Sequence, residues 1–146
     1  AFTRRATTHS TLKRWRTQGW IADGGNYKIR AYSRLDLYNR SQIKAAIYAD
    51  LGVQIGFMVP ASALDQFDNG QPWTVVPNDG GILGGHLVFC YGYGPNAVGC
   101  VTWGRRQSMS WEFFDTYSDE VWAVFDAVDS TRRLSVIDMA SLNNAI

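Results

Sequence analysis

The spacing of apolar and polar positions along the chain predicts an alternation of short helices and short strands. Apolar residues recur every three or four positions behind polar capping residues 8–11, behind Asn39 or Ser41, and within 61–67 and 110–117, which is typical of helices. Alternating or continuously apolar runs predict the strands 27–35, 51–59, 73–76, 86–91, 97–103 and 121–128. Residues 23–26 and 105–109 are interpreted as loops, and 136–146 as a weak helix. Strands and helices mixed in this way predict an α+β fold.

The most patterned region is a predicted β-hairpin. An apolar strand that starts at His86 is followed by the turn 92–96 (GYGPN) and by a second strand that ends at Trp103. Since the start of one arm and the end of the other are neighbours in a hairpin, we expect the imidazole and the indole to meet. Gly84 and Gly85 precede His86, and two explanations stay open for them: close approach of a substrate backbone, or a loop that needs positive φ.

Length and composition limit the class of protein. The chain has 146 residues, of which 46% are hydrophobic and 18% charged, which predicts a single domain over 1–146 with a basic arm at 1–9 and a tail at 130–146. No apolar run approaches 18 residues and no signal peptide is visible, so we expect a virion or cytoplasmic protein without a membrane partner. The start lacks Met, and we expect the segment to be trimmed, processed or part of a longer chain.

The net charge of +1 conceals an asymmetry. Residues 1–40 hold nine Lys or Arg against two Asp, whereas the remainder holds five basic residues against eleven acidic ones. A basic segment can dock on an acidic protein surface or on nucleic acid, and it can also be a solvated face. No zinc spacing, RNA-binding aromatic signature or phosphate loop is present, so nucleic acid is not the expected partner. No metal or other cofactor is expected either, because the acidic residues Asp115, Asp119 and Glu120 match no metal loop.

The two cysteines flank the turn of the predicted hairpin. A register that pairs Cys90 with Cys100 would place them opposite each other, whereas a shift of one residue would put them on opposite faces. The pattern does not fix that register. Two cysteines do not make a disulfide framework, and we expect free thiols.

Four segments follow one another in the second half of the chain: 85–88 (GHLV), 91–93 (YGY), 101–104 (VTWG) and 121–125 (VWAVF). This order resembles the C-terminal, histidine-bearing half of the papain-like cysteine peptidase fold. There a Gly/Asp-His-Ala-Val segment carries the catalytic histidine, and an Asn-Ser-Trp-Gly segment turns back beside it. The strand 52–59 looks like the family's cleft wall. The resemblance implies an antiparallel, barrel-like sheet with short flanking helices.

A narrower resemblance is to barely characterised papain-like proteins of actinobacteria and their phages. In these, Gly-Gly-His and Val-Thr-Trp-Gly occur together and precede a Met-Thr/Ser-Trp-x-Phe-Phe-Asp segment, as in residues 109–115 (MSWEFFD) of this chain. The resemblance covers roughly residues 10–128 and is most specific from His86 to Phe125.

The resemblance implies roles for single residues. His86 would be general base and acid, with Trp103 as its shield, Thr102 as a further site residue, and Gly84 and Gly85 in contact with substrate. The sequence departs from the family at the orienting Asn, whose place falls on Val101. Thr102 is expected to point to the other face of the strand, and Asn96 lies in the turn, so we expect another group, such as a backbone carbonyl, to hold the imidazole.

The second departure is the nucleophile. No cysteine precedes His86, although the family order is Cys, His, Asn. We therefore expect a papain-like half-domain that acts as a non-catalytic structural or interaction component, for example of a phage particle. The alternative is the C-terminal half of a thiol hydrolase, a peptidase or amidase, whose Cys lies on a missing N-terminal segment.

A half-domain should also leave an apolar face uncovered. Its cover would be that missing segment, a second copy or a neighbouring protein. The large apolar groups expected there are Trp15, Trp20, Ile47, Phe57, Trp73 and Trp122.

Overall fold

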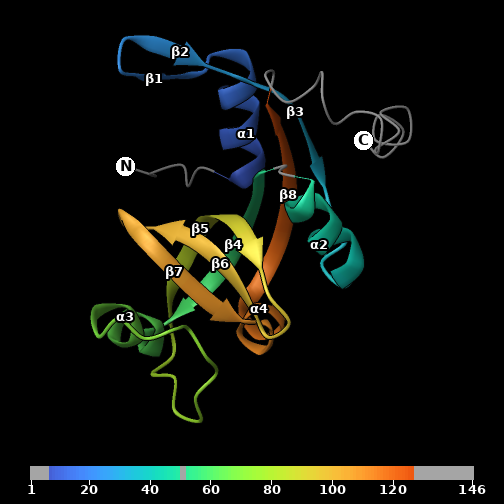
Figure 1. Ribbon diagram of the computed structural model, residues 1–146. Coiled ribbons are helices and arrows are strands. Elements are labelled where there is room, and N and C mark those ends of the chain that lie inside the picture. Colours follow the sequence, from blue (N-terminus) through green and yellow to red (C-terminus); the bar gives the residue numbers. More distant parts are fainter. Residues whose placement is uncertain (1–6, 50–51, 127–146) are drawn as a thin grey trace. The chain divides into compact units, whose positions relative to one another are not determined.

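The computed structural model describes residues 7–49 and 52–126. They form two compact units, described separately: unit 1 holds the described residues up to Ser33 and from Val124 onward, and unit 2 runs from Arg34 to Ala123 (Figure 1). The helices are α1 (Thr8–Thr17), α2 (Arg40–Tyr48), α3 (Ala61–Asp68) and α4 (Trp111–Tyr117). The strands are β1 (Trp20–Ala22), β2 (Gly25–Tyr27), β3 (Ile29–Arg34), β4 (Gly52–Pro60), β5 (Ile82–Tyr93), β6 (Ala97–Thr102), β7 (Arg105–Ser110) and β8 (Ser118–Asp126).

Unit 1 begins with a capped helix and a small hairpin. At the start of α1, the Thr7 hydroxyl accepts from the backbone N–H of Ser10 at 3.1 Å, and the Ser10 hydroxyl accepts from the backbone N–H of Thr7 at 3.0 Å, a reciprocal capping box. The prediction of a loop at 23–26 is wrong, because only Asp23 and Gly24 form the turn and the flanking residues pair as β1 and β2. Both turn residues have positive φ, as a two-residue type I′ turn requires.

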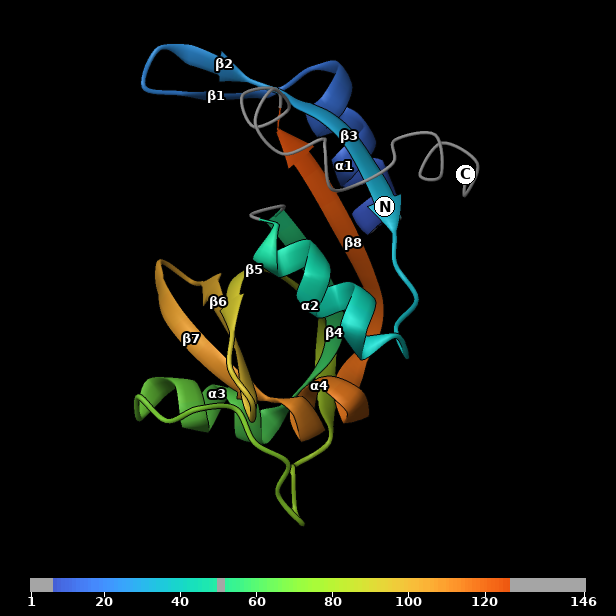
Figure 2. The same ribbon diagram turned by 45° about the vertical axis from the view of Figure 1, so that its right-hand side comes forward.

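Unit 2 is built on an antiparallel, barrel-like sheet. Along the sheet the strands follow the order β8-β4-β5-β6-β7. Each of the strands β4 to β7 pairs antiparallel with the strand that follows it in the sequence. Figure 2 shows these four strands curving around one axis. Side chains on each strand alternate between the two faces, and most of those that point inward are apolar and fill the core. The buried core includes Val53, Ile55, Phe57, Val88, Cys90, Val98, Cys100 and Met109.

Three short helices flank this sheet. The residues Ile43, Ala46 and Ile47 form the buried side of α2, which packs on β4 and β5. Both α3 and α4 lie at one end of the curved strands, where they bury Ala63 and Phe113 (Figures 1 and 2). The Ser110 hydroxyl caps α4 by accepting from the N–H of Phe113 at 3.0 Å. The observed α+β architecture confirms the predicted fold class.

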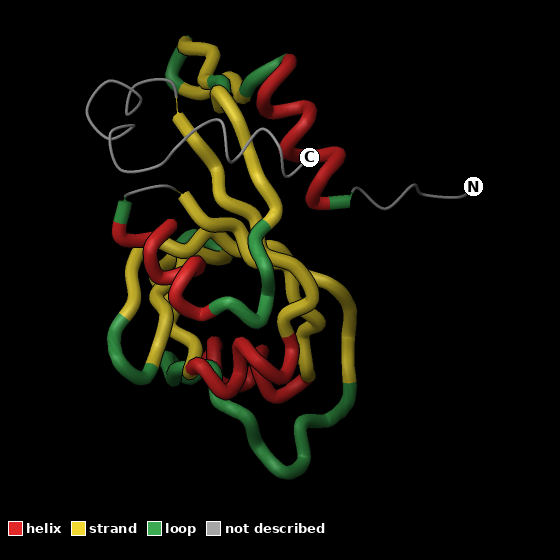
Figure 3. Tube along the Cα trace, turned by 90° about the vertical axis from the view of Figure 1, so that its right-hand side faces the viewer, coloured by secondary structure: helices red, strands yellow, loops and turns green. Residues whose placement is uncertain are grey.

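Two element predictions on the same edge of the sheet are wrong. Residues 105–109, predicted as a loop, begin strand β7, whose inward residues Gln107 and Met109 are buried. Residues 73–76, predicted as a strand, make only a single bridge from Trp73 to Met109. Trp73 donates its N–H to the Ser108 carbonyl and accepts from the N–H of Ser110, each at 2.9 Å. Trp73 belongs to the long loop between α3 and β5 that Figure 3 shows. Its two backbone hydrogen bonds cover part of the edge of β7, which would otherwise be unpaired.

The predicted helix at 136–146 and the tail at 130–146 lie outside the described residues. Of the basic arm predicted at 1–9, Thr8 and His9 belong to α1. No helix among residues 7–49 and 52–126 has the length and hydropathy to cross a membrane.

The turn between β6 and β7 offers a test of this backbone. Trp103 and Gly104 have φ of 44° and 79°, so this is a second two-residue turn with both residues in the left-handed region. Gly104→Ala should lower the free energy of unfolding by about 1–2 kcal/mol, because a Cβ disfavours that region. Gly84→Ala is the matched control: Gly84 has no positive φ and a Cβ there would meet nothing within 4 Å. Equal effects of the two variants in urea unfolding would contradict the assigned turn.

Candidate active site

His86 occupies the fifth position of β5 and points toward the core side of the sheet. Strand β4 places Phe57 directly opposite it, and the phenyl ring meets the imidazole edge-on at a centroid distance of 5.8 Å. The backbone register also explains its reach across the next strand. Since Phe89 pairs with Val101, Val88 faces Thr102, and His86 lies one inward position earlier on the same face. The imidazole can therefore reach Thr102 diagonally.

The Thr102 side chain holds the imidazole. A hydrogen bond of 2.6 Å joins His86 Nε2 to Thr102 Oγ1, and Thr102 is 5% exposed. The expectation that Thr102 points away from the histidine is therefore wrong. Val101 is the residue that faces solvent, at 44% exposure. The alternation of faces along a strand could have indicated this contact. His86, Val88 and Cys90 share the inward face of β5, and Thr102 lies on the inward face of β6.

Trp103 stacks on the same imidazole. The ring centroids are 4.5 Å apart with an interplanar angle of 21°, so the hairpin pattern correctly placed the two rings together. The indole is itself held edge-on by Phe67 at 4.8 Å and by Trp73 at 6.0 Å. The outer part of the indole remains in solvent, since Trp103 is 46% exposed. The stack restricts rotation of the imidazole and shields one of its faces.

Gly84 and Gly85 lie within β5, immediately before His86. Neither residue has a positive φ, so the interpretation as a loop that needs positive φ is wrong. A Cβ built on either would meet nothing within 4 Å, so packing inside the described part of the chain does not require glycine. The two residues leave a bare strand backbone beside the imidazole.

Burial lowers the pKa of His86 below its ordinary value of 6.5. Below about pH 6.5 the unfolded chain therefore binds more protons at this histidine than the folded chain does. As the pH falls through this value, the free energy of unfolding should fall, until the lower folded-state pKa is passed. His86→Gln should remove this part of the pH dependence between pH 7 and 5, as measured by urea unfolding. His9→Gln controls for the loss of a histidine as such, and identical pH profiles for wild type and His86→Gln would contradict the prediction.

Neither Cys90 nor Cys100 can act as a nucleophile beside His86 in this structure. Both are free and fully buried in the core of unit 2, on the strands that carry His86 and Thr102. Burial raises the pKa of the Cys90 thiol well above its usual value and that of Cys100 to about 12. Thiolate is the reactive form, so both thiols are unreactive near neutral pH.

Iodoacetamide should therefore label both cysteines of the folded chain slowly. Labelling should be much faster in the urea-unfolded chain, because unfolding returns the thiols to water. His86→Ala should leave the folded-state rate unchanged. Labelling is measured by mass spectrometry. Fast labelling near pH 7 that disappears in His86→Ala would reveal a thiolate–imidazole pair and contradict the placement of both cysteines in the core.

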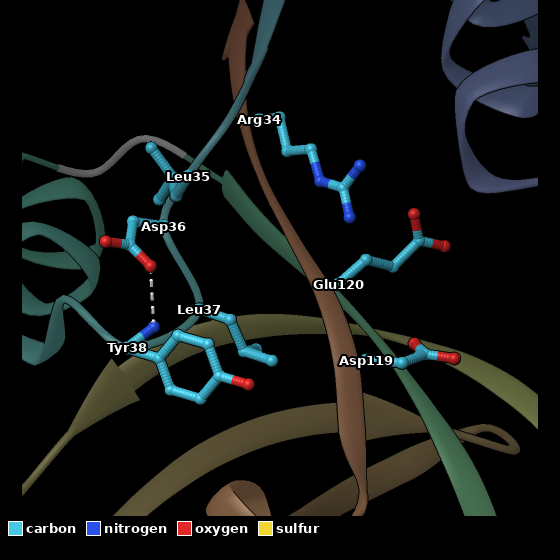
Figure 4. Close-up of a pocket in the computed structure, with 7 residues that line it drawn as sticks. All are labelled: Arg34, Leu35, Asp36, Leu37, Tyr38, Asp119 and Glu120. Carbon is cyan, nitrogen blue, oxygen red and sulfur yellow. Dashed lines mark hydrogen bonds between the residues drawn. The ribbon is translucent and has the colours of Figure 1, made fainter.

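Unit 2 also has a hollow of about 340 Å³ whose lining does not include the histidine. It is lined by Arg34, Leu35, Asp36, Leu37, Tyr38, Asp119 and Glu120. Figure 4 shows Arg34 and Glu120 on one side of it and Asp36 on the other. The Trp122 Nε1–H donates to Glu120 at 2.9 Å, and the Arg34 guanidinium lies 5.9 Å from the Trp122 ring. No three His, Cys, Asp or Glu gather as metal ligands in the described ranges.

The apolar side chains expected on an uncovered face differ in their exposure: Trp20 is 57% exposed in β1, and Trp15 and Trp122 are of intermediate exposure. Ile47, Phe57 and Trp73, expected on an uncovered face, are at most 4% exposed and belong to the core. Other apolar side chains on β4, β5, α3 and the β6–β7 turn are 37–59% exposed: Met58, Leu64, Ile82, Leu83 and Trp103. Several of these border the histidine in sequence or in register, since Met58 pairs with Gly85 and Trp103 stacks on His86.

The sequence and the fold were compared with known proteins. No family model and no curated protein matches the sequence. Among solved structures, xylellain, a cysteine protease from Xylella fastidiosa, matches with a TM-score of 0.55 and 24% sequence identity. The match covers 69% of this chain and 41% of xylellain, so the chain spans less than half the length of that protein. The matched part of the chain therefore has a papain-like α+β fold.

Proposed function

We propose that unit 2 is the histidine-bearing half of a papain-like thiol hydrolase site. His86 would be its general base and acid, and the nucleophilic thiol would come from outside these 146 residues. The observation that carries the proposal is the way the imidazole is held. Among the described residues, Thr102 is its only hydrogen-bond partner, through Nε2, and Trp103 stacks on one face. Nδ1 is then available to a thiol.

In this proposal His86 Nδ1 takes the proton of the thiol, while Nε2–H donates to Thr102 Oγ1. The thiolate attacks the carbonyl carbon of an amide, and the imidazolium then gives its proton to the leaving amine. Water hydrolyses the resulting thioester with His86 again as base. Because burial lowers the pKa of His86, the imidazole is neutral at pH 7 and ready to accept the first proton.

The surroundings of His86 support this use. Gly84 and Gly85 leave the backbone of β5 bare beside the imidazole, where a substrate backbone could pass. The exposed indole of Trp103 offers an apolar contact on the face of the imidazole, whereas the exposed side chains of Met58 and Leu83 lie at the same end of β4 and β5 on the outer face of the sheet. We propose that the segment with the thiol, or a second copy or neighbouring protein, covers these side chains. Burial of apolar surface would be the driving force.

A second candidate is a papain-like domain without catalysis, used as a structural or interaction part, for example of a phage particle. The observation that favours it is the state of the two thiols, both buried away from the imidazole. In that case the His86–Thr102–Trp103 contacts are core packing. This candidate predicts a protein partner and no hydrolase activity.

The test uses the natural translation product, including any residues that precede Ala1. We expect iodoacetamide to label one thiol rapidly near neutral pH, a thiol other than Cys90 and Cys100. His86→Ala should abolish the rapid phase, and His9→Ala should leave it unchanged. Absence of any rapidly labelled thiol in the folded product would contradict the hydrolase proposal and favour the non-catalytic candidate.

A further inference from the structure

Cys90 and Cys100 are direct partners in the antiparallel ladder of β5 and β6. Residues directly opposite in such a ladder have Cα atoms about 4.5–5.5 Å apart. A disulfide spans Cα separations of about 4.4–6.8 Å. Both side chains are fully buried on the inward face of the sheet, so they point the same way. Register, separation and direction therefore all fit a cross-strand disulfide, although both thiols are free in this structure.

We propose that Cys90 and Cys100 form a latent redox pair, which a small disulfide such as oxidised glutathione closes into a cross-strand bond. One thiolate attacks the glutathione disulfide, forming a mixed disulfide and releasing one glutathione thiolate. The second cysteine thiolate then attacks its partner's sulfur and releases the second glutathione. The protein loses two protons and two electrons, and the glutathione disulfide is reduced to two thiols.

Burial of both sulfur atoms makes formation and reduction of this disulfide slow. A sulfur in the core of unit 2 can meet a glutathione molecule only when the hairpin opens locally. The ladder offers a place for such opening, because its register shifts between Cys90 and Gly92, next to the turn at residues 94–96. Once closed, the bond would fix the register that brings His86 to Thr102. This inference does not depend on a hydrolase function.

The experiment incubates the 146-residue chain with oxidised glutathione in mildly destabilising urea and follows the product by mass spectrometry. We expect a monomer lighter by two hydrogens, with both changes in the tryptic peptide 45–105, which contains both cysteines and no internal Lys or Arg. Chymotryptic cleavage after Tyr91 and Tyr93 should leave the two halves joined until a reductant is added. The unfolding equilibrium constant of the oxidised chain should drop about 100-fold, as for a short closed loop.

A register-shifted variant is the matched control. Val98 is fully buried on the same inward face but pairs with Tyr93, so Val98→Cys combined with Cys100→Ala keeps two core thiols on β5 and β6 out of direct opposition. This variant should remain reduced or carry glutathione without closing. The proposal is overturned if wild type carries glutathione on both cysteines without closing, or cross-links only between chains. It is equally overturned if the register-shifted variant closes as readily as wild type.

Discussion

Replacing Trp73 with alanine should lower the free energy of unfolding by about 3–5 kcal/mol, the range for a large aromatic removed from a packed core. Trp73 is fully buried, stacks on Phe113 at a centroid distance of 5.7 Å, and meets Phe57 at 5.3 Å. Its Nε1–H also donates to the Ala63 carbonyl at 2.8 Å. The substitution therefore opens a cavity and leaves a buried carbonyl without its donor.

Two controls separate these contributions in urea unfolding followed by circular dichroism. Trp73→Phe keeps an aromatic ring but not the donor, and should cost clearly less than alanine. Trp20→Ala removes an indole that is 57% exposed in β1 and should change stability least. A loss for Trp73→Ala no larger than that for Trp20→Ala would contradict the central place of Trp73 in unit 2.

The second large effect concerns the proposed hydrolysis. In the natural translation product, His86→Ala should lower kcat/KM for a peptide or amide substrate about 100–10,000-fold, the usual contribution of a general base. Thr102→Val should cause a smaller loss and also shift the pH profile, because it removes the oxygen that holds Nε2 but not the base itself. His9→Ala should retain full activity. Equal activity of wild type and His86→Ala would contradict the role of His86 as the general base.

Much of unit 2 could be predicted from the sequence because its strands are apolar on at least one face. The hairpin of β5 and β6 is marked by two apolar runs around a Gly/Pro/Asn turn, and this was enough to bring His86 to Trp103. The resemblance of these segments to the papain-like family implied a papain-like fold, and the likeness to xylellain supports that fold.

Strand β7 could not be predicted, for a physical reason. Its sequence RRQSMS has a single apolar residue, Met109, and the other inward position holds Gln107. Gln107 is buried because its side-chain amide donates to the Gln71 carbonyl at 2.8 Å, a partner 36 residues away. Hydrophobic periodicity does not reveal a strand that is stabilised by such long-range polar contacts.

The contact between His86 and Trp103 was predicted from the hairpin pattern, but the contact between His86 and Thr102 was not. The family comparison directed attention to Val101, whereas the face of a strand residue depends on its parity with the histidine. Thr102 shares the inward face with His86, and the turn that follows places Trp103 at positive φ against the imidazole. A tryptophan in the left-handed region is uncommon and has no sequence signature.

In the proposed site, Thr102 holds the imidazole by Nε2 and leaves Nδ1 as the base. Nitrogen-15 NMR of the His86 ring in the 146-residue chain, recorded at a pH where the imidazole is neutral, tests this most directly. We expect the tautomer with hydrogen on Nε2, an unprotonated Nδ1, and a loss of that preference in Thr102→Val. A ring protonated mainly at Nδ1, with Thr102 donating to Nε2, would contradict it.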